Sequence, residues 1–272
     1  MVLQMVITLD SGHYGKYNQS PVIKNFYESE FNWKMTNKLA KYLKQYGITV
    51  KLTRSELNKD KALYERGLMA KGSDMFISIH ANACDDSGVD YPVVIRGFNE
   101  QSTDKLAMEL AVAIEDIMDT RQAGRTYVRR KKTTYDEYYG VLRGARKAGV
   151  KYRFIIEHSF YTNRRACSLL MDNNMIDRLA KKEAEIIARY FKVKSDVVEL
   201  PKGKHFIKVL QDNLNVRDKA DWKAKPVAQV NRGEVFTVVD TVTPKNGSVK
   251  MYKLKSGVYI TTHPQYVDSF YK

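Results

Sequence analysis

The pattern of apolar and polar residues predicts alternating strands and helices along residues 1–192. A nearly continuous apolar run over Met75–Ile79 is typical of a strand buried on both faces. Shorter runs predict further strands at 5–9, 48–53, 91–96 and 153–156. Apolar residues spaced three and four apart predict helices at 28–46, 59–71, 102–120, 142–147, 163–172 and 175–191.

This order of elements predicts an α/β domain over 1–192, with a mostly parallel sheet flanked by helices on both faces. The periodicity stops at 193–204, where a proline and a glycine indicate a linker. Short β-rich segments separated by turn signals occupy 205–272 and predict a small all-β barrel. The basic, tyrosine-rich stretch 121–140 fits no element, and both a solvated loop and a substrate-facing loop stay open for it.

The composition adds a strong positive charge to this picture. The formal net charge is +15 at pH 7, and the pI is near 9.5, which indicates a polyanionic partner such as nucleic acid, anionic lipid or cell-wall polymer. The sequence has no helix-turn-helix, zinc-finger or RNA-recognition signature, so specific nucleic-acid binding is not expected. No apolar run reaches the ~18 residues of a membrane helix, so membrane insertion is not expected.

The N-terminus and the cysteines indicate the cellular compartment in which the protein is made. Residues 1–10 lack the basic region and cleavage site of a signal peptide and predict a first strand instead. We therefore expect a protein that is made in the cytoplasm without a signal peptide. Its two cysteines, Cys84 and Cys167, make neither a disulfide framework nor a cysteine-rich zinc site.

Four residues are candidates for chemistry. His13, His80 and Glu157 come at or just after the carboxyl ends of predicted strands, which is the edge where open α/β sheets bind ligands. Glu28 begins the first predicted helix. Two histidines and a carboxylate are a common zinc-ligand set, and a second carboxylate is needed to move protons. This inventory fits His13, Glu28 and His80 as ligands and Glu157 as the acid/base, although the four form no compact motif.

Five segments carry these residues and their neighbours. They are L-D-S-G-H at 9–13, E-S-E-F-N-W at 28–33, L-T-R at 52–54, D-M-F-I-S-I-H-A-N at 74–82 and I-I-E-H-S-F-Y-T-N at 155–163. In this order they resemble the zinc-dependent N-acetylmuramoyl-L-alanine amidases of the type-3 family, over about 1–192. The resemblance implies a peptidoglycan hydrolase that cleaves the amide between N-acetylmuramic acid and L-alanine by zinc-activated water.

The resemblance also implies the roles of single residues. His13, Glu28 and His80 would bind Zn²⁺, and Glu157 would be the catalytic glutamate. The chain departs from the family at Tyr14, where many members have glycine. It departs again at 158–159, where His-Ser replaces a commoner pair of small residues.

Two alternative assignments stay open at this point. Glu30 lies close to Glu28, but the spacing from Glu28 to Asn32 favours Glu28 as the ligand. His158 lies next to Glu157, and neighbouring strand residues point to opposite faces, so only one of them faces a metal. We favour Glu157 there, with His158 structural or at the rim. Cys84 is interpreted as a loop or core thiol.

The second domain carries a weaker resemblance. L-N-V-R at 214–217 resembles the opening of a bacterial SH3-type wall-binding module, although the usual tryptophan-rich end is missing. Such a module implies that 205–272 binds the cell wall, and the positive charge fits anionic wall polymers of Gram-positive cells. The expected partners are therefore peptidoglycan and these polymers.

The two resemblances together imply a bacteriophage endolysin for Gram-positive hosts, with an amidase domain followed by an SH3-like domain. It would be made in the host cytoplasm and act on the wall after release. A bacterial autolysin or a zinc peptidase of the cell wall is the alternative within the enzyme class. A catalytically silent wall-binding protein would need a broken metal set, but all four key residues are present.

Overall fold

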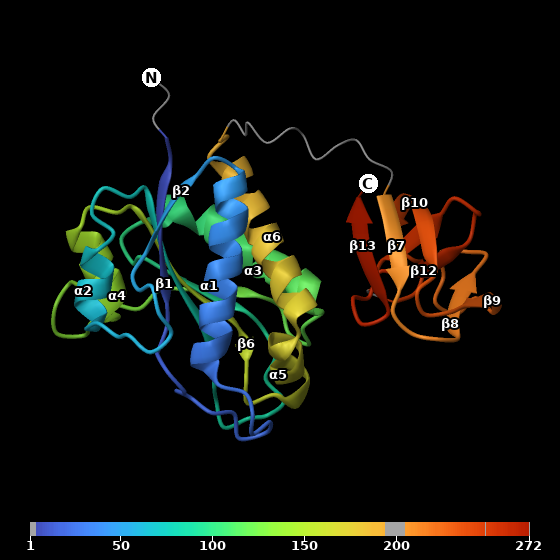
Figure 1. Ribbon diagram of the computed structural model, residues 1–272, viewed down its shortest axis with the longest axis horizontal. Helices are drawn as coiled ribbons and strands as arrows, with labels where there is room; N and C mark the ends of the chain where they lie inside the picture. The colour runs from blue at the N-terminus through green and yellow to red at the C-terminus, as the bar shows by residue number, and fades with distance from the viewer. Residues whose placement is uncertain (1–3, 194–204, 248, 272) are drawn as a thin grey trace. The chain divides into compact units, whose positions relative to one another are not determined.

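The computed structural model describes residues 4–193, 205–247 and 249–271. The chain divides into two compact units, Met1–Asp196 and Val197–Lys272, and each is described by itself (Figure 1). The predicted linker 193–204 lies outside the described residues, apart from Val193. Among the described residues, no helix is both long and apolar enough to cross a membrane.

The first unit is built on a six-stranded sheet. In spatial order the strands are β2 (Thr49–Leu52), β1 (Val6–Ser11), β3 (Met75–Asn82), β6 (Tyr152–Phe160), β4 (Val93–Arg96) and β5 (Arg125–Tyr127). All neighbouring pairs are parallel except β4 and β6. The predicted α/β fold with a mostly parallel sheet is confirmed.

Helices cover both faces of this sheet (Figure 1). They are α1 (Glu28–Gln45), α2 (Leu63–Leu68), α3 (Asp104–Met118), α4 (Gly140–Lys147), α5 (Arg164–Met171) and α6 (Asn173–Tyr190), with a 3₁₀ turn at Gln101–Thr103. Alternate strand residues enter different cores: Ile77 packs with α1, α3 and α6, whereas Phe76 packs with α4. This alternation explains why the central strand is apolar at successive positions.

The topology brings the candidate site residues to one edge of the sheet. β1, β3 and β6 are parallel neighbours, so their carboxyl ends meet at that edge. Ser11 pairs in register with Ile79, and His80 pairs with Glu157. The N-terminus of α1 lies beside the same edge, because the backbone of Gly12 is hydrogen-bonded both to Ile79 and to the Asn32 side chain.

The second unit is an all-antiparallel sheet of seven strands. In spatial order they are β13 (Val267–Tyr271), β7 (His205–Val209), β10 (Val235–Val242), β11 (Met251–Leu254), β12 (Tyr259–Thr261), β8 (Leu214–Arg217) and β9 (Pro226–Val230). Its small core includes Ile207, Val209 and Ile260, all of them fully buried. Each of these strands lies where the sequence predicts a β-rich segment.

Candidate metal centre and active site

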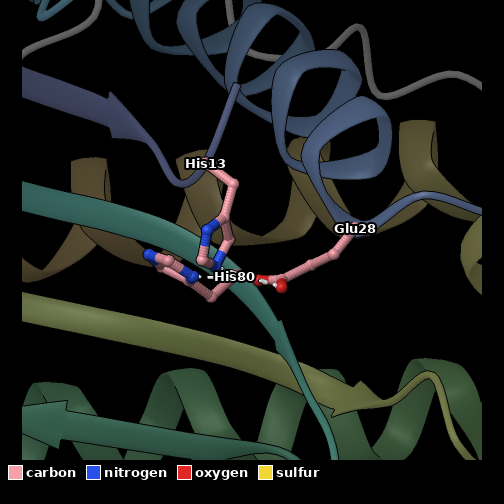
Figure 2. Close-up of side chains that lie close together, drawn as sticks. All are labelled: His13, Glu28 and His80. Atoms are coloured by element: carbon pink, nitrogen blue, oxygen red, sulfur yellow. Dashed lines mark hydrogen bonds and ion pairs between the residues drawn. The ribbon is translucent and has the colours of Figure 1, made fainter. Parts of the chain in front are cut away.

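Three side chains from separate parts of the first unit converge at the carboxyl edge of the sheet (Figure 2). His13 Nε2 lies 3.2 Å from one carboxylate oxygen of Glu28, and His80 Nδ1 lies 2.9 Å from the other. One ligand atom from each residue lies within 4.8 Å of the others. The structure therefore brings together the three residues that the sequence predicts as metal ligands.

The donor set fits a zinc ion. Zinc bonds of about 2.0–2.2 Å in a tetrahedral arrangement place neighbouring donor atoms roughly 3.3 Å apart. The contacts of Glu28 with the two histidines, at 2.9 and 3.2 Å, are close to this separation. Two imidazoles and one carboxylate also leave a fourth position for water, as in catalytic zinc sites.

Glu28 is the most firmly held of the three. Its side chain is 2% exposed, and it accepts hydrogen bonds from the Asn18 amide (2.6 Å), the Asn32 amide (3.2 Å) and the Ala81 backbone (3.2 Å). Burial alone would raise the pKa of Glu28, but its hydrogen bonds with the two histidines lower it well below the ordinary range. Glu28 is therefore a carboxylate at neutral pH, as a metal ligand must be.

The two histidines are positioned by the turn that follows β1. His13 has a φ of 54°, in the left-handed region that residues other than glycine seldom adopt. Gly12 lies against the His80 ring, and a Cβ at position 12 would come within 2.2 Å of His80 Cε1. Glycine is needed at position 12 because the His80 ring fills the space that a side chain would take.

Glu157 lies beside His80 on the adjacent strand. The two residues are paired in register, so their side chains leave the same face of the sheet. Burial raises the pKa of Glu157 to about 7, with a further contribution from the charge of Glu28. Glu157 Oε2 is buried and has no hydrogen-bond partner among the described residues. A carboxyl with these properties can take up and release a proton near neutral pH.

His158 points to the opposite face, as alternation along β6 requires. It is fully buried, with Nε2 2.8 Å from Glu183 Oε1 on α6 and Nδ1 3.0 Å from the backbone oxygen of His80. Its ring also packs edge-on against Phe31. His158 therefore ties β6 to α6 and β3, and of the two neighbours Glu157 is the one on the same face of the sheet as His80.

The structure separates the other candidates from the cluster. Within the described residues, Glu30 is in the first turn of α1 but contributes no donor, and Cys84 is directed at the backbone oxygen of Asp86. Arg54 is nearly buried, and its guanidinium donates to Ser11 Oγ and to the Leu57 backbone. It holds the 54–57 loop against the end of β1.

Sequence reasoning missed Asn18. Its side-chain nitrogen lies 2.6 Å from Glu28 and 3.1 Å from His13 Nε2, so it contacts two of the three candidate ligands. It lies in the stretch 16–27, which predicts only a loop, and its own φ is 55°. An asparagine in a loop predicts a turn, and it carries no separate signal for a role beside a metal.

Comparison with known proteins gives a family match. A family model described as N-acetylmuramoyl-L-alanine amidase matches residues 7–189. An endolysin of Bacillus phage SPP1 is 30% identical over 288 residues, which span 97% of this chain and 98% of the relative. The second match includes both units.

Solved structures resemble the first unit. The catalytic domain of CwlV, an N-acetylmuramoyl-L-alanine amidase from Bacillus (Paenibacillus) polymyxa var. colistinus, has a TM-score of 0.59 and 23% identity, covering 70% of this chain and 100% of that one. An N-acetylmuramoyl-L-alanine amidase from Clostridium difficile 630 has the same TM-score and 22% identity, covering 71% and 99%. At these identities the likeness concerns the fold.

Proposed function

Because the chain belongs to the N-acetylmuramoyl-L-alanine amidase family, we propose that it cleaves peptidoglycan at the amide between N-acetylmuramic acid and L-alanine with a bound zinc ion. His13, Glu28 and His80 would hold the metal, and Glu157 would move the proton. The observation that carries this proposal is the convergence of the three donors next to a buried carboxyl whose pKa is about 7.

The residues of the chain divide the chemistry between them. A bound zinc ion would lower the pKa of its water to about 7 and polarise the amide carbonyl. Glu157 would accept the proton from the attacking water and deliver it to the alanine nitrogen as that amine leaves. Asn18 and Asn32 would keep the Glu28 carboxylate in place, as outer hydrogen bonds do for metal ligands in general.

We further propose that the protein is a phage endolysin with a catalytic domain at 1–192, a linker at 193–204 and an SH3-like wall-binding domain at 205–272. The full-length similarity to a phage endolysin supports this arrangement, as does the antiparallel sheet of the second unit. Tethering by a wall-binding domain raises the effective substrate concentration. The enzyme would be made in the host cytoplasm and act on peptidoglycan and its anionic polymers after release.

A product assay on purified Gram-positive walls tests the proposal. The expected products are new N-terminal alanine amines without new reducing sugar ends. Their formation should stop when a chelator removes the metal and resume with added zinc. New amines on other residues would indicate a peptidase, and reducing ends would indicate a glycosidase. Binding to walls without any product would indicate a silent wall-binding protein.

A further inference from the structure

Two exposed tyrosines extend outward from the metal cluster. The Tyr17 ring stacks on the ring of His13, with centroids 5.2 Å apart and planes 9° from parallel. The Tyr14 ring stacks in turn on Tyr17 at 6.1 Å and 23°. Tyr14 is 42% exposed and Tyr17 51% exposed, so the rings present an aromatic surface to solvent. We propose that these two rings form the subsite for the amino sugar of the substrate, an inference that rests on the proposed amidase function.

The backbone that carries the Tyr17 ring is held by hydrogen bonds to the first turn of α1 and to the 54–57 loop. The Tyr17 backbone accepts from and donates to Ser29 in the first turn of α1, with its N–H 2.9 Å from Ser29 Oγ. Ser29 Oγ also donates to the Gly15 carbonyl at 2.7 Å, and the Gly15 N–H donates to Leu57 at 2.9 Å. A backbone held in this way has less conformational freedom to lose when a ligand binds.

The chemistry of the substrate places a sugar at this position. In an N-acetylmuramoyl-L-alanine amide, three single bonds of about 1.5 Å separate the sugar ring from the scissile carbonyl carbon. A carbonyl at the donor cluster therefore keeps the nearest atom of its sugar ring within about 4 Å of the scissile carbon, in the neighbourhood of the three candidate ligands. Tyr17 is the exposed ring that stacks on His13. A pyranose has a face of C–H groups, and these suit the electron-rich face of an aromatic ring.

The distribution of charge favours the sugar over the peptide at this surface. Residues 12–18 contain no carboxylate, and their one cation, Lys16, lies over the Tyr27 ring. In the sheet order, β1 is followed by β3 with His80, β6 with Glu157, then β4 and β5. On that side, Arg125 at the start of β5 is paired with Val93, which is paired with Glu157, so a cation lies level with the site. An acidic stem peptide is drawn to that side, which leaves the neutral sugar for the tyrosines.

A pair of matched substrates tests this subsite in the full-length zinc enzyme. One is N-acetylmuramoyl-L-alanyl-D-isoglutamine, and the other is D-lactoyl-L-alanyl-D-isoglutamine, which keeps the scissile amide but lacks the sugar. The measured quantity is the ratio of kcat/KM for the two. Tyr14→Leu should lower the ratio about tenfold, the size expected for loss of an aromatic contact, and Tyr14→Phe should restore it.

Tyr14 is the first target because its ring contact is with Tyr17, and not with His13. Tyr17→Leu should lower the ratio as well. Its zinc content is measured alongside, because the Tyr17 ring stacks on His13, a proposed zinc ligand. Tyr46→Leu, at the other end of α1, is the control and should leave the ratio unchanged. If neither small substrate is cleaved, the measurement is instead the inhibition of wall hydrolysis by N,N′-diacetylchitobiose. This disaccharide should inhibit Tyr14→Leu less strongly than it inhibits the wild type.

The outcomes separate this inference from the amidase proposal. An unchanged ratio in Tyr14→Leu, or equal losses on both substrates, overturns the sugar subsite while alanine release from walls still supports the amidase. Equal inhibition of the wild type and Tyr14→Leu by the chitobiose also overturns it. A wild-type enzyme that releases no alanine amines from walls overturns the amidase proposal itself.

Discussion

At the scale of single residues, the proposed mechanism assigns proton transfer to Glu157 and metal binding to three other side chains. Glu157 is paired in register with His80, but the cluster of candidate donors consists of His13, Glu28 and His80, and Glu157 Oε2 has no hydrogen-bond partner among the described residues. Glu157→Gln keeps the shape and removes the acid. We expect zinc content and folding to be retained and wall hydrolysis to fall about a thousandfold, the usual size of a general acid–base contribution.

Glu30→Gln is the matched control, because Glu30 lies in the first turn of α1 outside the metal cluster. It should retain zinc and activity. Near-normal hydrolysis by Glu157→Gln would remove Glu157 from the proposed role. Loss of zinc by Glu30→Gln would instead reopen the choice of the glutamate ligand.

Gly12 gives a second prediction at this scale. A methyl group at position 12 would lie 2.2–2.6 Å from three atoms of the His80 ring, which hydrogen bonds to Glu28 and Ser78 already restrain. Gly12→Ala should displace the ring and lower zinc affinity at least about tenfold, as loss of ligand orientation does elsewhere. Zinc affinity is measured by competition with a chromophoric chelator.

Gly88→Ala is the comparison for that variant. A Cβ at position 88 would meet the flexible side chain of Asp86 at 3.1 Å, so little displacement is required. Zinc affinity should be unchanged there. Equal affinities in Gly12→Ala and the wild type would show that the ring has room to move, and the proposed role of Gly12 would be wrong.

The sequence predicts the donors of the site better than it predicts their supports. His13, His80 and Glu157 follow strands whose apolar runs are plain in the sequence, so a common edge follows from parallel pairing. Asn18 and the space above Gly12 depend on how a loop folds back onto α1. No local pattern encodes that geometry, and only tertiary contacts reveal it.

At the scale of elements, α2 and α4 pack closely through facing glycines. A Cβ on Gly144 would lie 2.1 Å from the backbone oxygen of Tyr64, and one on Gly67 would lie 2.1 Å from that of Val141. Gly144→Ala should therefore push the helices apart and lower the free energy of unfolding by about 2 kcal/mol, despite the better helix propensity of alanine. Urea unfolding measures the loss, with exposed Lys147→Ala on the same helix as control. No loss relative to that control would contradict the close packing.

The contact between α1 and α6 gives a pH-dependent prediction. Asp177 accepts hydrogen bonds from Lys38 (2.8 Å) and from the Tyr42 hydroxyl (2.6 Å). Burial alone would raise the pKa of Asp177, but these bonds lower it below its ordinary value of 3.8. A carboxyl with a lowered pKa stabilises the fold fully above pH 3.8, and the stabilisation is lost as the pH falls through the folded-state pKa.

Asp177→Asn should therefore cost about 1 kcal/mol at pH 7, because the side chain is 39% exposed and solvent screens the pair. The difference from the wild type should shrink as the pH falls below 3.8 and disappear once the pH is below the folded-state pKa, where the aspartate is protonated. Unfolding free energies measured across this range test the sign. A difference that grows on acidification would contradict the assignment.

Element types followed from periodicity, whereas some boundaries and pairings did not. The expected helix 59–71 is only Leu63–Leu68, since its glycine packs against α4 and its ends are turns. β4 is antiparallel to β6, a direction that an apolar run does not encode. The unassigned stretch 121–140 contains the short strand β5, and three of its four arginines lie over tyrosine rings, as Arg129 does over Tyr138 at 3.6 Å.

At the scale of the whole molecule, the turn signals of the C-terminal quarter indicate its β-rich segments, and seven antiparallel strands lie there. The structure divides into the units Met1–Asp196 and Val197–Lys272, whereas the domain limits 1–192, 193–204 and 205–272 stay a prediction. Whether the second unit is an SH3-like wall-binding domain stays a prediction. Its ligand depends on surface side chains that strand periodicity does not specify.

The net charge of +15 gives the last prediction. If anionic wall polymers attract the enzyme, raising the salt from about 0.1 to about 1 M shortens the Debye length from about 10 to about 3 Å and should weaken wall binding at least about tenfold. Co-sedimentation with walls measures binding, and walls stripped of anionic polymers should show a much smaller effect. The rate of hydrolysis of a small muramoyl peptide with amidated carboxyls should change little with salt concentration, because an uncharged substrate is not attracted by the positive charge of the protein. Equal salt dependence on stripped and intact walls would mean that the charge serves another partner.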